Sequence, residues 1–162
     1  MWPPKMNRTG FSWRTGIASF VMFEILLLAL QFILGMYVNL FVTIPQLSFG
    51  YGMMDGMMAL MFTAGMSLVM LHMFIGMIIG VVSIFILVMS LIAGASRIAY
   101  LSVISLGFVT LAGINGILFL FGGQNNVNSF AMAVSFLVVL LAQFFILYYT
   151  LDTAGPNKQS VR

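Results

Sequence analysis

57-MMALMFTAGMSLVMLHMFIGMIIGVVSIFILVMSLIAG-94 is the stretch that decides the fold, because His72 is its only ionisable side chain. A run this long and this apolar predicts a helix surrounded by lipid. At the helical period, one face carries small and polar residues: Gly65, His72, Gly76, Gly80, Ser83, Ser90 and Gly94. A second stripe consists of Met66, Met70, Met73 and Met77. The two stripes indicate a helix that packs against other helices.

The composition of the whole chain extends this conclusion to all 162 residues, of which 62% are hydrophobic and 6% are charged. A water-soluble domain of this length needs a far more charged surface. We therefore expect one integral membrane domain, 1–162. The absence of cysteine excludes disulfides, iron–sulfur clusters and zinc–thiolate sites. The six scattered Lys and Arg residues form no basic face, so nucleic acid is not an expected partner.

Four apolar segments predict an all-α, integral membrane four-helix bundle. The predicted spans are 17–42, 66–93, 98–121 and 129–151, the last with Ser129 as N-cap. The first segment is too long for the apolar region of a signal peptide, so we interpret it as a retained helix. The run quoted above exceeds one bilayer thickness but cannot hold two spans and a turn. We expect a short interfacial helix at 53–64 with a bend near Gly65, the alternative being one long tilted helix.

The charges predict the orientation in the membrane. Four spans place both termini on one side, and every basic residue lies on that side: Lys5, Arg8, Arg14, Arg97, Lys158 and Arg162. Asp55 lies on the opposite side. The positive-inside rule then predicts a multi-pass protein of the cell membrane with both termini cytoplasmic, N-in and C-in. We could align no internal repeat.

Polar residues at bilayer depth are the candidates for function, because they are costly there. Glu24, Gln31, Gly35 and Asn39 share one face of the first span, and we expect that face to meet the second span. Gly76 and Gly80, spaced as small-x-x-x-small, favour a close approach of the two backbones. We expect a helix-packing polar cluster made of Glu24, Gln31, Asn39, Gly76, Gly80 and Asn115.

His72 has several possible roles. It could bind haem b, either with a nearby methionine or with His72 of a second copy, or it could bind a quinone or transfer protons. The alternative, which we prefer, is a helix-packing histidine bonded to an asparagine at the same depth, Asn39 or Asn115, or to a backbone carbonyl. Glu24 could relay protons or bind a cation. For Glu24 we favour a structural carboxyl group that is neutral or bonded to a neighbouring Ser, Thr or Tyr, and its extension toward the basic inner surface is a further alternative.

Nine of the 15 methionines lie between Met53 and Met77. Clustered thioethers can bind Cu(I), so Met53, Met54, Met57 and Met58 are a candidate copper site. Methionine also fills irregular gaps and suits partner-binding surfaces. We expect this second role for most of the cluster.

GMYVNLFVTIP (35–45), Leu71-His72 followed by Gly76, AGING (112–116) and Met132-Ala133 resemble the motifs of a family of small four-span membrane proteins of bacteria and archaea. No activity is established for that family. The resemblance implies four spans, draws attention to Asn39, His72 and Asn115, and implies no chemistry.

These features favour a non-catalytic integral membrane subunit of a larger complex, and we consider a respiratory or other redox complex. The chain contains no nucleophile motif, phosphate-binding loop or paired carboxylates, so we expect no catalytic activity of its own. Its expected partners are membrane lipid and other membrane subunits, or copies of itself. One alternative is an electron-transfer protein that binds haem or copper through His72 and the methionine cluster. Another is a small oligomeric transporter or channel using Glu24 and Gln31.

Overall fold

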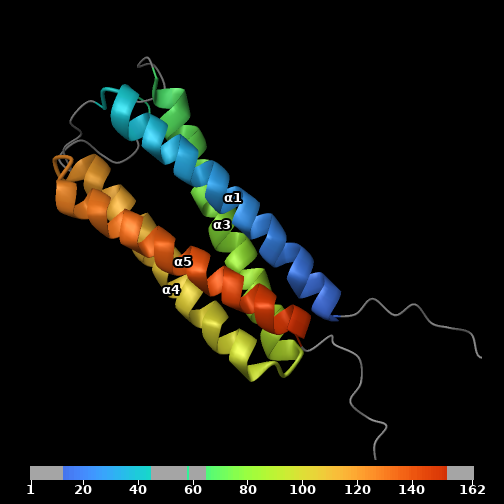
Figure 1. Cartoon of the computed structure of the whole chain (residues 1–162). Helices are drawn as coiled ribbons and strands as arrows, with labels where there is room; N and C mark the ends of the chain where they lie inside the picture. Colours follow the sequence, from blue (N-terminus) through green and yellow to red (C-terminus); the bar gives the residue numbers. More distant parts are fainter. Residues whose placement is uncertain (1–12, 45–57, 59–64, 153–162) are drawn as a thin grey trace, which may run out of the picture.

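The computed structural model describes residues 13–44, 58 and 65–152. In this part of the chain four helices are present and no strand: α1 (Trp13–Phe41), α3 (Met66–Ile92), α4 (Ser96–Phe121) and α5 (Asn126–Asp152). All four are long and apolar enough to cross a membrane. The structure thus confirms the all-α class and the four apolar helices (Figure 1).

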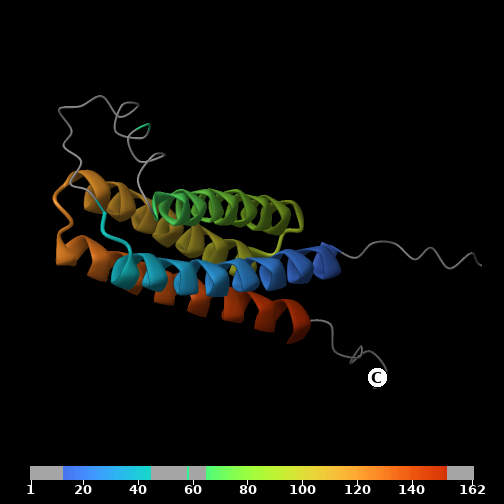
Figure 2. The ribbon, with the colours of Figure 1, turned by 90° about the horizontal axis from the view of Figure 1, so that it is seen from above.

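The helices contact one another in a closed square. Among the described residues, α1 contacts α3 and α5, and α4 contacts the same two helices, whereas the diagonal pairs make no contact. Successive helices run in opposite directions, so the start of α1, the end of α5 and the α3–α4 turn lie at one end of the bundle (Figures 1 and 2). We call this the terminal end.

Local sequence accounts for the points at which the helices begin and end. Gly65 precedes α3 with a φ of 83°, and Gly94 lies in the α3–α4 turn with a φ of 65°. Both values favour glycine, because a Cβ atom clashes with the backbone there. The bend predicted near Gly65 falls where α3 begins. The interfacial helix predicted at 53–64 lies outside the described residues, apart from Met58.

Three helices begin before the spans predicted from hydropathy, α4 by two residues, at Ser96 rather than at 98. Helix α1 already includes Trp13, the first described residue, whereas the predicted span begins at 17, since hydropathy marks the part in the hydrocarbon and the helix continues beyond it. Helix α5 starts at Asn126, because the side chain of Asn125 accepts a hydrogen bond of 2.9 Å from the backbone N–H of Val127. The prediction of Ser129 as the N-cap is therefore wrong.

Three apolar clusters fill the bundle from end to end. The cluster at the terminal end contains Ile17, Val21, Val82, Ile86, Ile98 and Ile146. The middle cluster contains Leu28, Ile75, Ile79 and Val139. The cluster at the opposite end contains Val38, Val69, Leu120 and Phe121. Large apolar side chains also cover the outside of the bundle, as expected for a surface in contact with lipid.

The helix pairs α1–α3 and α4–α5 have buried side chains at matching sequence positions, with one constant offset for each pair of equivalent helices. Six buried residues of α5 each follow a buried residue of α3 by 60 positions: Ile75/Ser135, Ile79/Val139, Val82/Ala142, Ser83/Gln143, Ile86/Ile146 and Ser90/Thr150. Helices α1 and α4 match at an offset of 81: Ile17/Ile98, Val21/Ser102 and Glu24/Ser105. Only two of these nine pairs keep the same residue, which explains why alignment of the sequence finds no repeat.

Candidate functional site

Each helix contributes one polar side chain to a layer that crosses the interior of the bundle. Glu24, Ser83, Ser105 and Gln143 are all at most 1% exposed. Ser83 Oγ donates a 2.6 Å hydrogen bond to Glu24 Oε1, and Gln143 Nε2 donates a 3.0 Å bond to Ser105 Oγ. The amide of Gln143 also lies beside the Glu24 carboxyl group. We call these four residues the polar layer.

The polar layer retains two hydrogen-bonding atoms without a partner. Glu24 Oε2 and Gln143 Oε1 are both buried and accept no hydrogen bond from the described residues. Buried polar atoms are nearly always paired in folded proteins, because an unpaired one costs about 1–3 kcal/mol. These two atoms therefore need an explanation.

Three other buried hydroxyls have ordinary structural partners, whereas the buried Ser135 Oγ has none among the described residues. Ser90, Ser102 and Thr150 each donate to a backbone carbonyl three or four residues earlier in their own helix, at 2.7–2.9 Å. This is the usual way in which a membrane helix satisfies a hydroxyl. These three residues require no ligand.

A second polar contact joins α1 to α3 nearer the opposite end of the bundle. Gln31 Nε2 lies 3.2 Å from His72 Nε2. With Gln31 Nε2 in this position the amide donates, which corresponds to the tautomer of His72 that accepts at Nε2 and carries its proton on Nδ1. His72 Nδ1 and Gln31 Oε1 are both buried without a hydrogen-bond partner among the described residues.

Two glycines make room for this contact. A Cβ atom added to Gly35 would lie 2.8 Å from Cε1 of His72, and one added to Gly76 would lie 3.3 Å from Nε2 of Gln31. The His72 ring thus packs against the backbone of α1, and the Gln31 amide packs against the backbone of α3. The structure brings together Gln31 and Gly76 of the predicted cluster.

The other members of the predicted cluster lie elsewhere. Glu24 is in the polar layer, and Gly80 faces Val109 of α4, whose Cγ1 would be 3.9 Å from an added Cβ atom. Asn39 is exposed on α1. Asn115 is half-exposed and donates a 2.8 Å hydrogen bond to the carbonyl of Leu111 in its own helix. An asparagine does not pair with His72, because Gln31 occupies that position, so this part of the expectation is wrong. The alternative of a backbone carbonyl as partner stays a prediction.

The predicted copper ligands are mostly outside the described residues. Met53, Met54 and Met57 lie there, and Met58 is described and exposed. Within the described ranges, no group of three or more His, Cys, Asp or Glu side chains could hold a metal ion. The copper site of the methionine cluster stays a prediction.

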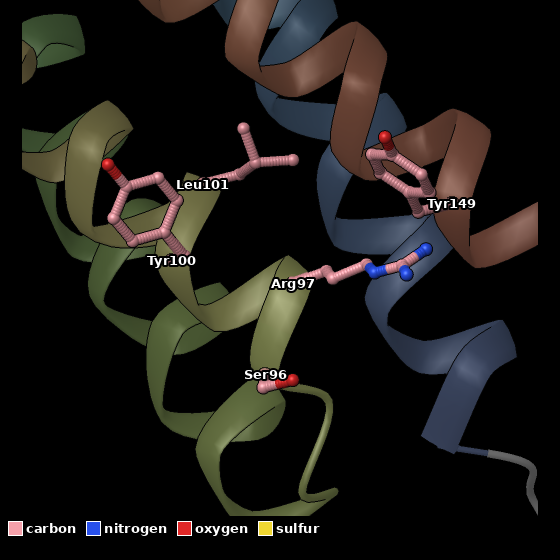
Figure 3. Close-up of a pocket in the computed structure, with 5 residues that line it drawn as sticks. All are labelled: Ser96, Arg97, Tyr100, Leu101 and Tyr149. Carbon is pink, nitrogen blue, oxygen red and sulfur yellow. The ribbon is translucent and has the colours of Figure 1, made fainter.

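A pocket of about 350 Å³ lies at the terminal end, which the sequence did not predict. It is lined by Ser96, Arg97, Tyr100 and Leu101 of α4 and by Tyr149 of α5. Figure 3 shows the Arg97 side chain extending from α4 toward Tyr149. An arginine and two tyrosines at the end of a membrane helix are typical of the headgroup region. The sequence feature that could have indicated this pocket is the tight basic turn followed by Tyr100.

Comparison of the chain with protein-family models, curated proteins and solved structures finds no match. The resemblance to the four-span family stays an expectation from the sequence.

Proposed function

We propose that this protein is a non-catalytic integral membrane subunit that packs, through the lipid-facing side of α4, against a transmembrane helix of another protein. A respiratory or other redox complex is the assembly that we propose to examine first. In this proposal both termini face the cytoplasm, as the basic residues indicate.

The outer face of α4 is the observation that supports this proposal. The most apolar part of α4 is less buried than the corresponding part of the other helices, at 11% against 22%, 33% and 28% for α1, α3 and α5. Over their full lengths α1, α4 and α5 have six buried residues each, so the difference lies in the middle of α4. Its outer face consists of exposed residues: Val103, Gly107, Thr110, Ile114 and Ile117. No atom lies within 4 Å of a Cβ atom added to Gly107, so the face is open at that point.

Small residues allow the backbones of two membrane helices to approach closely. Gly107 and Thr110 give α4 a point of close approach of this kind, between the larger side chains of Val103 and Ile114. The Thr110 hydroxyl already donates 2.9 Å to the carbonyl of Leu106, so contact with a neighbouring helix leaves it satisfied. The lipid-facing sides of α3 and α5 instead carry bulky residues such as Phe74, Met77, Leu141 and Phe144.

Photo-crosslinking in native membranes tests this proposal. A photoreactive amino acid at Ile114 is expected to form a covalent adduct with a second membrane protein, which mass spectrometry then identifies. The matched control is the same amino acid at Leu141, an equally exposed residue of α5 (51% and 50% exposed). Adducts with lipid alone from both positions, together with monomeric migration in blue-native electrophoresis, would contradict the proposal. An adduct of twice the chain mass would mean that the partner is a second copy of this chain rather than another protein.

A second candidate function rests on His72, whose buried Nδ1 has no partner. In the tautomer that accepts from Gln31, this atom carries a proton that a quinone carbonyl could accept. Haem is less well supported by the geometry, since Gln31 occupies Nε2 and Gly35 lies against the ring. Extraction of bound quinone and a reduced-minus-oxidised spectrum of the purified protein test both ligands. Absence of quinone, of a haem band and of metal would eliminate this candidate.

A further inference from the structure

We propose that Glu24 is a buried proton-binding site, in which the carboxyl group carries a proton on Oε2 and donates it to Oε1 of Gln143. This site lies in the interior of the bundle, is separate from the outer face of α4, and does not depend on the function proposed above.

A single proton explains both unpaired atoms of the polar layer. An ionised Glu24 can only accept hydrogen bonds, and Gln143 Oε1 can only accept as well, so neither could satisfy the other. Protonated Glu24 becomes a donor, and Gln143 Oε1, on the amide beside the carboxyl group, is the acceptor that lacks a partner. Both orphan atoms are then paired without a further ligand.

The resulting chain of hydrogen bonds connects all four helices. Ser83 of α3 donates to Glu24 of α1, as described above, and Glu24 would donate to Gln143 of α5. Gln143 in turn donates to Ser105 of α4. Because the two hairpins share one register, each supplies one hydrogen-bonded pair at this level, and the proton joins the two pairs.

The surroundings of Glu24 favour the neutral acid. A carboxylate inside a bundle in lipid is very costly unless a cation accompanies it. The described residues contain two positively charged side chains, Arg14 and Arg97, near the starts of α1 and α4. Each lies at least about 12 Å along its helix from the polar layer, at 1.5 Å per residue. His72 lies still farther from the polar layer, along α3. Asp152, at the end of α5, is an acid and supplies no positive charge.

The sequence allows a direct test, because Glu24 is the only glutamate in the chain. Glutamate labelled with 13C in its side-chain carboxyl, introduced by cell-free synthesis, reports Glu24 alone. In lipid nanodiscs at pH 7, the infrared spectrum is expected to show the C=O stretch of a carboxylic acid that shifts with the label and with deuteration. Carboxylate bands alone would overturn the proposal. The measurement needs no substitution, so it remains valid if a variant fails to fold.

Gln143→Leu tests the partner of the proton. Removal of the acceptor is expected to move the labelled C=O stretch to higher frequency, because the acid loses its hydrogen bond. Gln31→Leu is the matched control, since it removes a glutamine from the His72 contact and should leave the band in place. An unmoved band in Gln143→Leu would refute Gln143 as the acceptor.

Discussion

Ser83 donates a 2.6 Å hydrogen bond to Glu24 and so joins α3 to α1 in a part of the bundle from which solvent is excluded. Ser83→Ala removes this bond and leaves the Glu24 carboxyl with one partner fewer. We expect a loss of about 1–2 kcal/mol in the free energy of unfolding, within the range for an unpaired buried group or an interhelical bond in a membrane. Thermal unfolding in detergent measures it.

Ser102→Ala is the control for this substitution. Ser102 is equally buried, but its hydroxyl donates 2.9 Å to the carbonyl of Ile98 in the same helix. Its removal breaks no contact between helices and is expected to cost less than half as much. Equal losses in the two variants would mean that the bond between Ser83 and Glu24 contributes nothing specific.

The close packing of Gly35 against His72 gives a second prediction. In Gly35→Ala the new methyl group would lie 2.8 Å from Cε1 of His72, so the ring must move away and its contact with Gln31 is lost. We expect a destabilisation of about 1–3 kcal/mol, as for overpacking of a well-packed interior. Adding His72→Ala should recover part of this loss, because the clash disappears.

Gly113→Ala is the matched control for the glycine substitution. No atom lies within 4 Å of a Cβ atom added there, and the residue is inside helix α4. Alanine is the better helix former by about 1 kcal/mol, so a neutral or slightly positive effect is expected. If both glycine variants have the same stability, Gly35 is not required for close packing.

Hydropathy was sufficient to predict the four helices, because each of them must satisfy its backbone hydrogen bonds inside lipid. It predicted the start of α3 at Met66 but not the earlier starts of α4 and α5. The start of α5 is set by the Asn125 cap, which leaves no mark in the apolar pattern. The face shared by Glu24 and Gln31 was also readable, since helical periodicity determines it.

The partners of these residues were less predictable. Asn39 lies on the predicted face by angle but is exposed, because contact also depends on where two helices cross. The bond between Gln143 and Ser105 depends on the register in which α5 packs against α4. No sequence motif in the apolar segments indicates that register. The polar layer is therefore a property of the assembled bundle rather than of one segment.

Because the outer face of α4 is open at Gly107, a bulky side chain at this position is expected to weaken assembly. Gly107→Leu adds a bulky side chain to the outer face of α4, where no atom lies within 4 Å of the added Cβ atom. The bundle is expected to fold as before, because the side chain points to lipid or to the partner. Overpacking of a helix contact by about 1–3 kcal/mol should weaken assembly roughly tenfold or more. Blue-native electrophoresis measures the shift toward the monomer.

Leu137→Phe on α5 serves as the control for that experiment, since it enlarges an exposed side chain on a different helix. It should leave assembly unchanged. Loss of the assembled form in both variants would point to a general effect on the membrane domain, and loss in neither would refute the outer face of α4 as the contact.

The absence of cysteine makes the orientation in the membrane testable with single substitutions. Ser96 and Asn126 are exposed at the first residues of α4 and α5, which lie at opposite ends of the bundle (Figure 1). Arg97 lies beside Ser96, so the positive-inside rule places that end in the cytoplasm. An impermeant maleimide should label Asn126→Cys in intact cells and Ser96→Cys only after permeabilisation. The reverse pattern would contradict the N-in, C-in arrangement and would place Arg97 and the pocket beside it on the outer surface.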